Sequence, residues 1–165
     1  MKTKEIYWLF GTTAFIPILN LIFYGIDGFT SEAVIDINVH DTYYVISNFH
    51  FMLILGVLVF FGVYLLRTLI HKFKNLTANL ILMISIILLS IVLTGISTML
   101  DGLIEQTSHW TVYPPSSVEN HVPDIEPRAS NLSILAPVLF YIQILLLVFL
   151  AYSGFKTGRN YKSNI

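Results

Sequence analysis

Residues 36–66 read DINVHDTYYVISNFHFMLILGVLVFFGVYLL, and this stretch decides the class of the protein. It opens with polar and acidic residues and two adjacent tyrosines. It then continues as a long apolar run that is interrupted early by Asn48 and His50. A helix needs about 20 apolar residues to cross the hydrocarbon core of a bilayer, and aromatic residues gather at the membrane interface. We therefore expect a transmembrane helix over residues 43–66, with the tyrosines at its entrance.

The whole chain is apolar enough to belong in a membrane. Hydrophobic residues make up 55% of it and charged residues only 12%, whereas soluble domains carry about 25% charged residues. The apolar segments predict helices over residues 6–24, 43–66, 79–100 and 132–154, joined by outer loops at 25–42 and 101–131. The predicted fold is an all-α membrane protein, a four-transmembrane-helix bundle that forms a single domain over residues 1–165.

The distribution of charge predicts the orientation of this bundle. Every lysine and arginine except Arg128 falls in the N-terminal segment, the loop after residue 66 or the C-terminal tail. Every aspartate and glutamate except Glu5 falls in the two remaining loops. Because positively charged segments stay on the cytoplasmic side, we expect both termini in the cytoplasm, N-in and C-in. The expected location is the cytoplasmic (inner) membrane of a bacterium.

Several kinds of chemistry have no basis in the sequence. The chain contains no cysteine, which excludes disulfides, thiolate metal sites and cysteine nucleophiles. It has no basic patch of the kind that binds nucleic acid. The third apolar segment holds no ionisable residue, and this argues against a proton-pumping role. In the fourth segment, Gln143 is expected to form an interhelical hydrogen bond rather than to act as a catalyst.

A short motif at the start of the second segment resembles a known family. Residues 40–50, HDTYYVISNFH, resemble the start of a haem-bearing helix in heme-copper oxidase subunit I, the core of cytochrome c oxidase, which reads approximately HDTYYVVAHFH. Residues 110–115, WTVYPP, are similar to the outer-face segment after the third helix of that subunit. The order of apolar segments follows its first four helices. The chain thus looks like a truncated four-helix homologue of subunit I.

The resemblance implies candidate cofactor-binding residues. In the family, one histidine of the motif binds the high-spin haem and the other binds the low-spin haem. Here the first position is Asn48, and only the low-spin position, His50, is kept. Tyr43 and Trp110 match positions near the haem propionates, or else they are simply residues of an aromatic belt. At a rise of 1.5 Å per residue from Tyr43, we expect His50 about 10 Å below the interface. It would bind haem there, or form a hydrogen bond to a neighbouring helix.

The same motif implies a candidate metal site. His40 and Asp41 match the family's non-redox magnesium or manganese site on the outer face, although a hard cation takes about six oxygen ligands and the others would come from elsewhere. The alternative is that both residues cap the second helix, where a carboxylate is favoured. Copper is not expected, because the family's copper ligands lie on later helices that this chain does not contain.

Three functions follow as hypotheses, and none includes a catalytic residue in this chain. The leading one is an accessory or interaction subunit of a respiratory complex, not catalytic alone, that docks through its outer loops. The second is a small b-type cytochrome in which His50 residues of two chains hold a low-spin haem, since bis-histidine ligation needs two helices. The third is a fragment of a split terminal oxidase core subunit. The expected partners are membrane lipid and either other respiratory subunits or a second copy of the chain.

Overall fold

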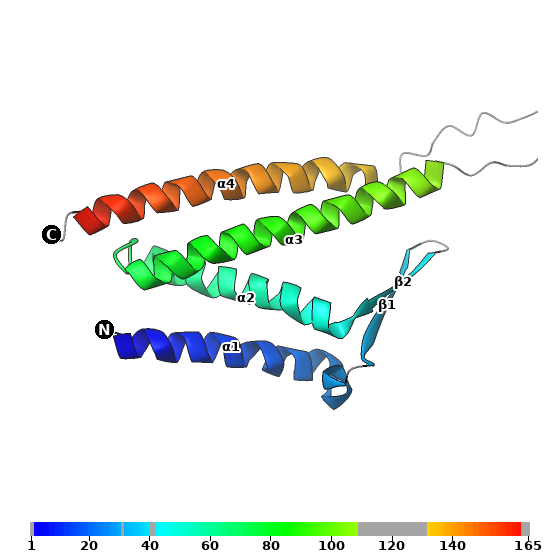
Figure 1. Cartoon of the computed structure of the whole chain (residues 1–165), viewed down its shortest axis with the longest axis horizontal. Helices are drawn as coiled ribbons and strands as arrows, with labels where there is room; N and C mark the ends of the chain where they lie inside the picture. The colour runs from blue at the N-terminus through cyan, green and yellow to red at the C-terminus, as the bar shows by residue number, and fades with distance from the viewer. Residues whose placement is uncertain (1, 31, 40–41, 109–131, 163–165) are drawn as a thin grey trace, which may run out of the picture. The chain divides into compact units, whose positions relative to one another are not determined.

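Four long helices account for most of the chain that the structure describes, which is residues 2–30, 32–39, 42–108 and 132–162 of this computed structural model (Figure 1). The helices are α1 (Lys2–Tyr24), α2 (Asn48–Ile70), α3 (Leu76–Ser108) and α4 (Leu132–Lys162). Each contains a segment that is long and apolar enough to cross a membrane. The prediction of four helices of membrane-spanning length and hydropathy is confirmed. Helices α3 and α4 extend beyond their predicted ends.

The segment between α1 and α2 differs from the prediction. It forms a short 3-10 helix, η1 (Ile26–Phe29), and an antiparallel hairpin of β1 (Val34–Val39) and β2 (Thr42–Ser47). Figure 1 shows this hairpin at the end of α1 and α2 where the two helices are connected. The expected start of the second helix at residue 43 is wrong, because residues 43–47 belong to β2. The reason is the run of β-branched and aromatic residues on both strands, which favours extended backbone.

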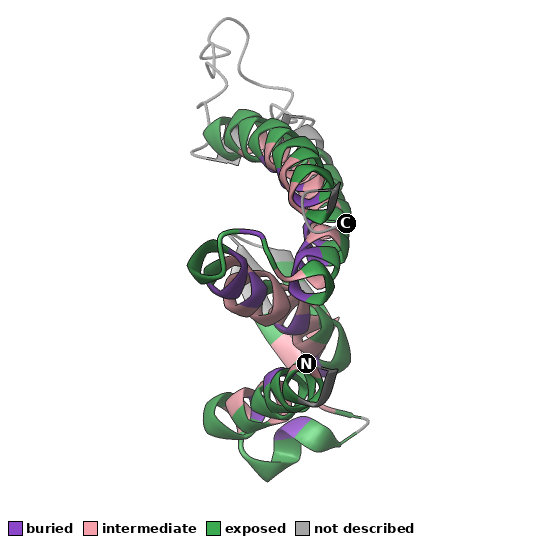
Figure 2. Cartoon of the chain, turned by 90° about the vertical axis from the view of Figure 1, so that its left-hand side faces the viewer, coloured by how far each residue is buried: buried purple, intermediate pink, exposed green. Residues whose placement is uncertain are grey.

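The described chain divides into two compact units. The first comprises Met1–Leu89 and Val148–Ile165, and the second comprises Ser90–Leu147. Figure 2 shows that buried residues are confined to narrow strips of each helix. In the first unit these strips are unusually polar. They include Thr12, Asn20, Asn48, Arg67, Thr68, Asn79, Ser85, Ser153 and Thr157. This is the pattern expected where lipid surrounds a fold, because hydrogen bonds and close packing then hold the helices together.

The turn between α2 and α3 shows this polar packing. Phe73 has left-handed backbone, with φ 61°, and its N–H donates to Thr68 O at 3.0 Å. The carbonyl of Phe73 accepts from Asn79 Nδ2 at 2.9 Å and from Asn160 Nδ2 at 3.1 Å. Asn79 Nδ2 also donates to Thr157 Oγ1 at 3.0 Å. The C-terminal part of α4 is therefore attached to the turn by side-chain amides.

The second unit contains the remaining halves of α3 and α4. Gln143 Nε2 of α4 donates to Thr94 Oγ1 of α3 at 3.4 Å, and Thr94 Oγ1 itself donates to Ser90 O at 2.9 Å. The predicted interhelical hydrogen bond of Gln143 is confirmed. Among the residues of this unit whose burial is described, Leu146 is the buried apolar one.

Candidate functional site

His50 lies in the first turn of α2, and its side chain is exposed. Its ring makes an edge-on contact with the neighbouring Phe49, with centroids 6.0 Å apart. The helical rise from Tyr43 on which the expected depth of about 10 Å was based is wrong, because most of the residues between Tyr43 and His50 are in a strand and not in a helix. His50 is therefore the third residue of α2 and lies at its N-terminal end.

A second histidine ligand is not near His50 in the described part of the chain. The other histidine that the structure describes, His71, follows the C-terminal end of α2. Since α2 rises about 1.5 Å per residue, the two histidines are separated by about 30 Å. A haem on His50 with two histidine ligands would therefore take its second ligand from another chain or from outside the described residues.

The other candidate residues from the sequence are only partly placed. Tyr43 lies on β2, and 72% of its surface is exposed. Trp110, His40 and Asp41 lie outside the described residues. The alternative that His40 and Asp41 cap the second helix is wrong, because α2 begins at Asn48 and its N-cap residue is Ser47.

Asn48 is buried, and its side-chain nitrogen helps to hold the structure together. Only 2% of its surface is exposed, and its Nδ2 donates to Asn20 Oδ1 at 3.0 Å and to Gly28 O at 2.5 Å. Its backbone N–H donates to Ala33 O at 2.9 Å. The side chain thus joins the start of α2 to α1 and η1, and it points away from the exposed side on which His50 lies, as expected for residues two apart on a helix.

A charged cluster at the opposite ends of α1 and α2 was not predicted from the sequence. Arg67 Nη2 donates to Glu5 Oε1, which also accepts from Asn75 Nδ2 at 2.7 Å. The side chains of Arg67 and Glu5 are 8% and 12% exposed. The guanidinium carbon of Arg67 lies 5.0 Å from the ring centroid of Trp8, which is a cation–π distance. The signal that could have revealed this cluster is Glu5 itself, the one acidic residue among the basic segments.

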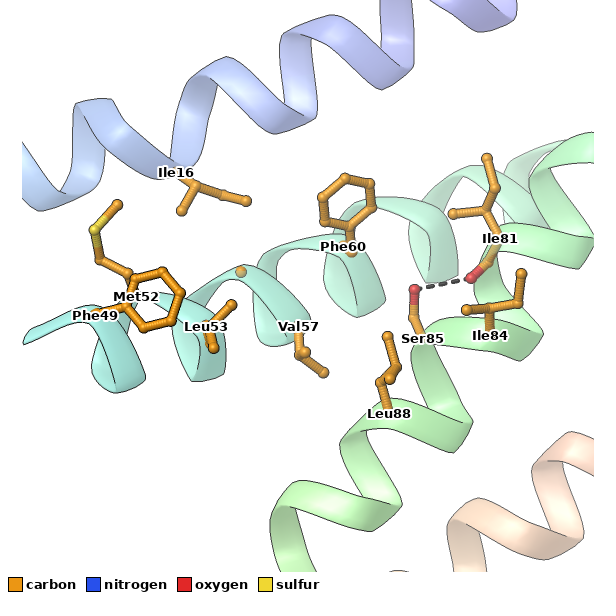
Figure 3. Close-up of a pocket in the computed structure, with 11 residues that line it drawn as sticks. Ile16, Phe49, Met52, Leu53, Val57, Phe60, Ile81, Ile84, Ser85 and Leu88 are labelled. Atoms are coloured by element: carbon orange, nitrogen blue, oxygen red, sulfur yellow. Dashed lines mark hydrogen bonds between the residues drawn. The ribbon is translucent and has the colours of Figure 1, made fainter.

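One opening in the first unit that the structure describes is apolar. It is a groove of about 460 Å³ along α2, with further walls from α1 and α3 (Figure 3). Its polar side chain is Ser85, whose hydroxyl already donates to Ile81 O at 2.8 Å. The groove therefore offers hydrocarbon contacts and no free catalytic group.

No arrangement of metal ligands is found in the part of the chain that the structure describes, where no three histidine, aspartate or glutamate side chains come together. No family model, no curated protein and no solved structure matches this chain. The resemblance to heme-copper oxidase subunit I therefore rests on residues 40–50 and 110–115 and on the order of the apolar segments.

Proposed function

We propose that this chain is an accessory subunit of a respiratory complex in the bacterial cytoplasmic membrane, resembling a truncated heme-copper oxidase subunit I and not catalytic by itself. The observation that carries the proposal is the state of Asn48. The family has a high-spin haem ligand at this position, whereas here a buried amide is bonded to Asn20 and Gly28. Because only 2% of its surface is exposed, the side chain leaves no space for a haem beside it.

The surfaces of the helices support a role in assembly. In the four spanning segments, between 6% and 22% of the residues are buried within the chain. The other described residues of these segments are partly or fully exposed on the chain itself, which leaves surface available for lipid or a partner. At the hairpin, Tyr43 and Val45 are 72% and 65% exposed. Aromatic side chains of this kind are common anchors of protein interfaces. The HDTYY segment is thus the expected docking surface on the outer face.

A deletion and rescue experiment tests this function. Membranes from cells that lack the protein should consume oxygen more slowly than wild-type membranes when supplied with a reductant. The intact chain should restore the rate, and the double variant Tyr43→Ala, Val45→Ala should not. Tyr161→Ala is the control, because Tyr161 is another exposed aromatic residue, at the C-terminal end of α4. Oxygen consumption that is unchanged by the deletion would overturn the proposal.

The second candidate is a small b-type cytochrome, and the exposure of His50 favours it. A ligand histidine that is exposed at the entrance of a spanning helix is placed for contact with another chain. Haem, when bound, would supply one-electron transfer. A reduced-minus-oxidised visible spectrum of the protein, purified after expression with ample haem, should then show a low-spin band that His50→Ala removes.

The same variant separates the two candidates. An accessory subunit with His50→Ala should restore oxygen consumption as well as the intact chain does. A cytochrome with His50→Ala should fail to restore it. A flat spectrum together with full rescue would leave the accessory role and eliminate the cytochrome.

A further inference from the structure

The groove along α2 is built almost entirely from hydrocarbon. Its lining residues come from three helices of the first unit and are Ile16, Phe49, Met52, Leu53, Gly56, Val57, Phe60, Ile81, Ile84, Ser85 and Leu88. All of them fall within segments of membrane-spanning length and hydropathy. Figure 3 shows Met52, Leu53 and Val57 of α2 on one side and Ile84 and Leu88 of α3 on the other.

One of the residues that line the groove is a glycine, Gly56. A Cβ atom at Gly56 would lie 3.3 Å from Ile16 Cδ1, so the absence of a side chain lets α1 approach α2 here. Gly56 is buried, and the other residues that line the groove have larger side chains. The recess is therefore a consequence of close packing between α1 and α2.

The chemistry of the groove selects an uncharged and apolar occupant. None of its lining residues is charged, and the hydroxyl of Ser85 is already bonded to Ile81 O. A ligand that brought a polar group here would lose hydrogen bonds with water or headgroups and gain none. The groove is also continuous with the lipid-facing surface of α2, where Leu53 and Leu58 are 54% and 48% exposed.

The size of the wall residues distinguishes a lipid from a partner helix. Helices associate in membranes through faces rich in glycine, alanine and serine, because small residues let the backbones approach. This groove is instead walled by phenylalanine, leucine, isoleucine and methionine. Long unbranched side chains such as Met52 adapt to irregular apolar shapes, and the shape of an acyl chain changes with its rotamers.

We propose that this groove is a binding site for one acyl chain of a membrane phospholipid, which it holds in preference to the rest of the lipid-facing surface. The bound chain fills the recess above Gly56 and contacts α2 and α3 together. The site takes hydrocarbon and does not select a headgroup, since all of its lining groups lie within the spanning segments.

Photocrosslinking of the full chain tests the site. The protein is placed in phosphatidylcholine vesicles that contain a phosphatidylcholine with a diazirine on one acyl chain, and the labelled residues are mapped by mass spectrometry. Labelling of Met52, Leu53, Ile84 and Leu88 should exceed that of Leu66 and Ile91 several-fold. Leu66 and Ile91 are apolar residues of α2 and α3 outside the groove, and both are more exposed than the four groove residues. Equal labelling of both sets would overturn the proposal, as would crosslinks from the groove to a second protein chain.

A groove-filling variant provides the second test. Val57→Trp should reduce labelling of Ile84 and Leu88 several-fold, because the indole would occupy the place of the acyl chain. Leu58→Trp is the matched control, since Leu58 is the next residue of α2 and does not line the groove. Unchanged labelling in the Val57→Trp variant would contradict the site. The wild-type map remains decisive if that variant does not fold.

Discussion

At the scale of single residues, Asn48 shows how one side chain takes a structural role at a position where the resembling family has a metal ligand. Its amide bonds to two elements that precede it by 20 and 28 residues, Gly28 of η1 and Asn20 of α1. Gly28 is required for this approach, because a Cβ atom there would lie 2.8 Å from Tyr24 Cβ and 3.3 Å from Asn48 Nδ2. The fold at this end therefore depends on an amide and a glycine together.

The first prediction concerns this amide. Asn48→Ala should lower the free energy of unfolding by about 1–3 kcal/mol, because the buried partners at Asn20 and Gly28 lose a donor. Thermal or denaturant unfolding in detergent, followed by circular dichroism, measures the change. His50→Ala is the control, since that side chain is exposed, and it should change stability by no more than about 0.5 kcal/mol. Equal losses in the two variants would show that the hydrogen bonds of Asn48 do not stabilise the fold.

Residues such as these mark the limit of what the sequence could predict. The presence of Asn48 where the similar motif has a histidine was visible in the sequence. The partners of Asn48 were not, because hydrogen bonds across 20 or more residues depend on how α1 and η1 turn back toward α2. The exposure of His50 was likewise unpredictable, since periodicity alone does not say which face of an apolar helix is covered.

At the scale of the elements, the hydropathy of the chain predicted the helices but not the hairpin. Apolar runs of membrane-spanning length have one common solution, a helix. The residues TYYVIS of β2 lead into α2 with only Asn48 and His50 as polar interruptions, so hydropathy did not separate the strand from the helix. Their β-branched and aromatic character was the only sign of a strand, and such preferences depend on a pairing partner. That partner, β1, lay in a segment expected to be a loop.

The second prediction concerns the charged contact that joins the ends of α1 and α2. Glu5→Gln should destabilise the protein by about 3–5 kcal/mol, because it leaves the buried guanidinium of Arg67 without its counter-charge. The change is measured by unfolding in detergent. Lys4→Gln is the control from the same helical turn, and its exposed side chain should contribute little to stability.

A double variant, Glu5→Leu with Arg67→Met, should recover most of the lost stability, because both charges are removed together. A Glu5→Gln variant as stable as the control would show that the ion pair adds nothing.

At the scale of the whole molecule, the distribution of polar and apolar residues is the one that a bilayer requires. Asparagine, serine, threonine and arginine are buried in hydrogen-bonded clusters, whereas isoleucine, leucine and phenylalanine dominate the exposed surface. In water this arrangement would expose a large apolar area. In lipid it is stable, because hydrocarbon contacts the apolar surface and the helices satisfy most of their backbone amides internally. Four apolar helices and a polar interior thus give one consistent interpretation, an integral membrane protein.

The third prediction is the orientation of the chain in that membrane, with both termini in the cytoplasm. It follows from the charge asymmetry, since basic residues resist translocation more than acidic ones. Because the chain has no cysteine, single cysteines report their side without background. Glu32→Cys between η1 and β1 should react with a membrane-impermeant maleimide in intact cells. Lys4→Cys in α1, Lys74→Cys between α2 and α3 and Arg159→Cys in α4 should react only after the membrane is permeabilised. All four positions are exposed, so access to the reagent depends only on the side of the membrane.

Labelling of Lys4→Cys and Arg159→Cys in intact cells would mean the inverse orientation. Labelling of only one of the two would mean an odd number of crossings, so one of the four helices would not span the bilayer.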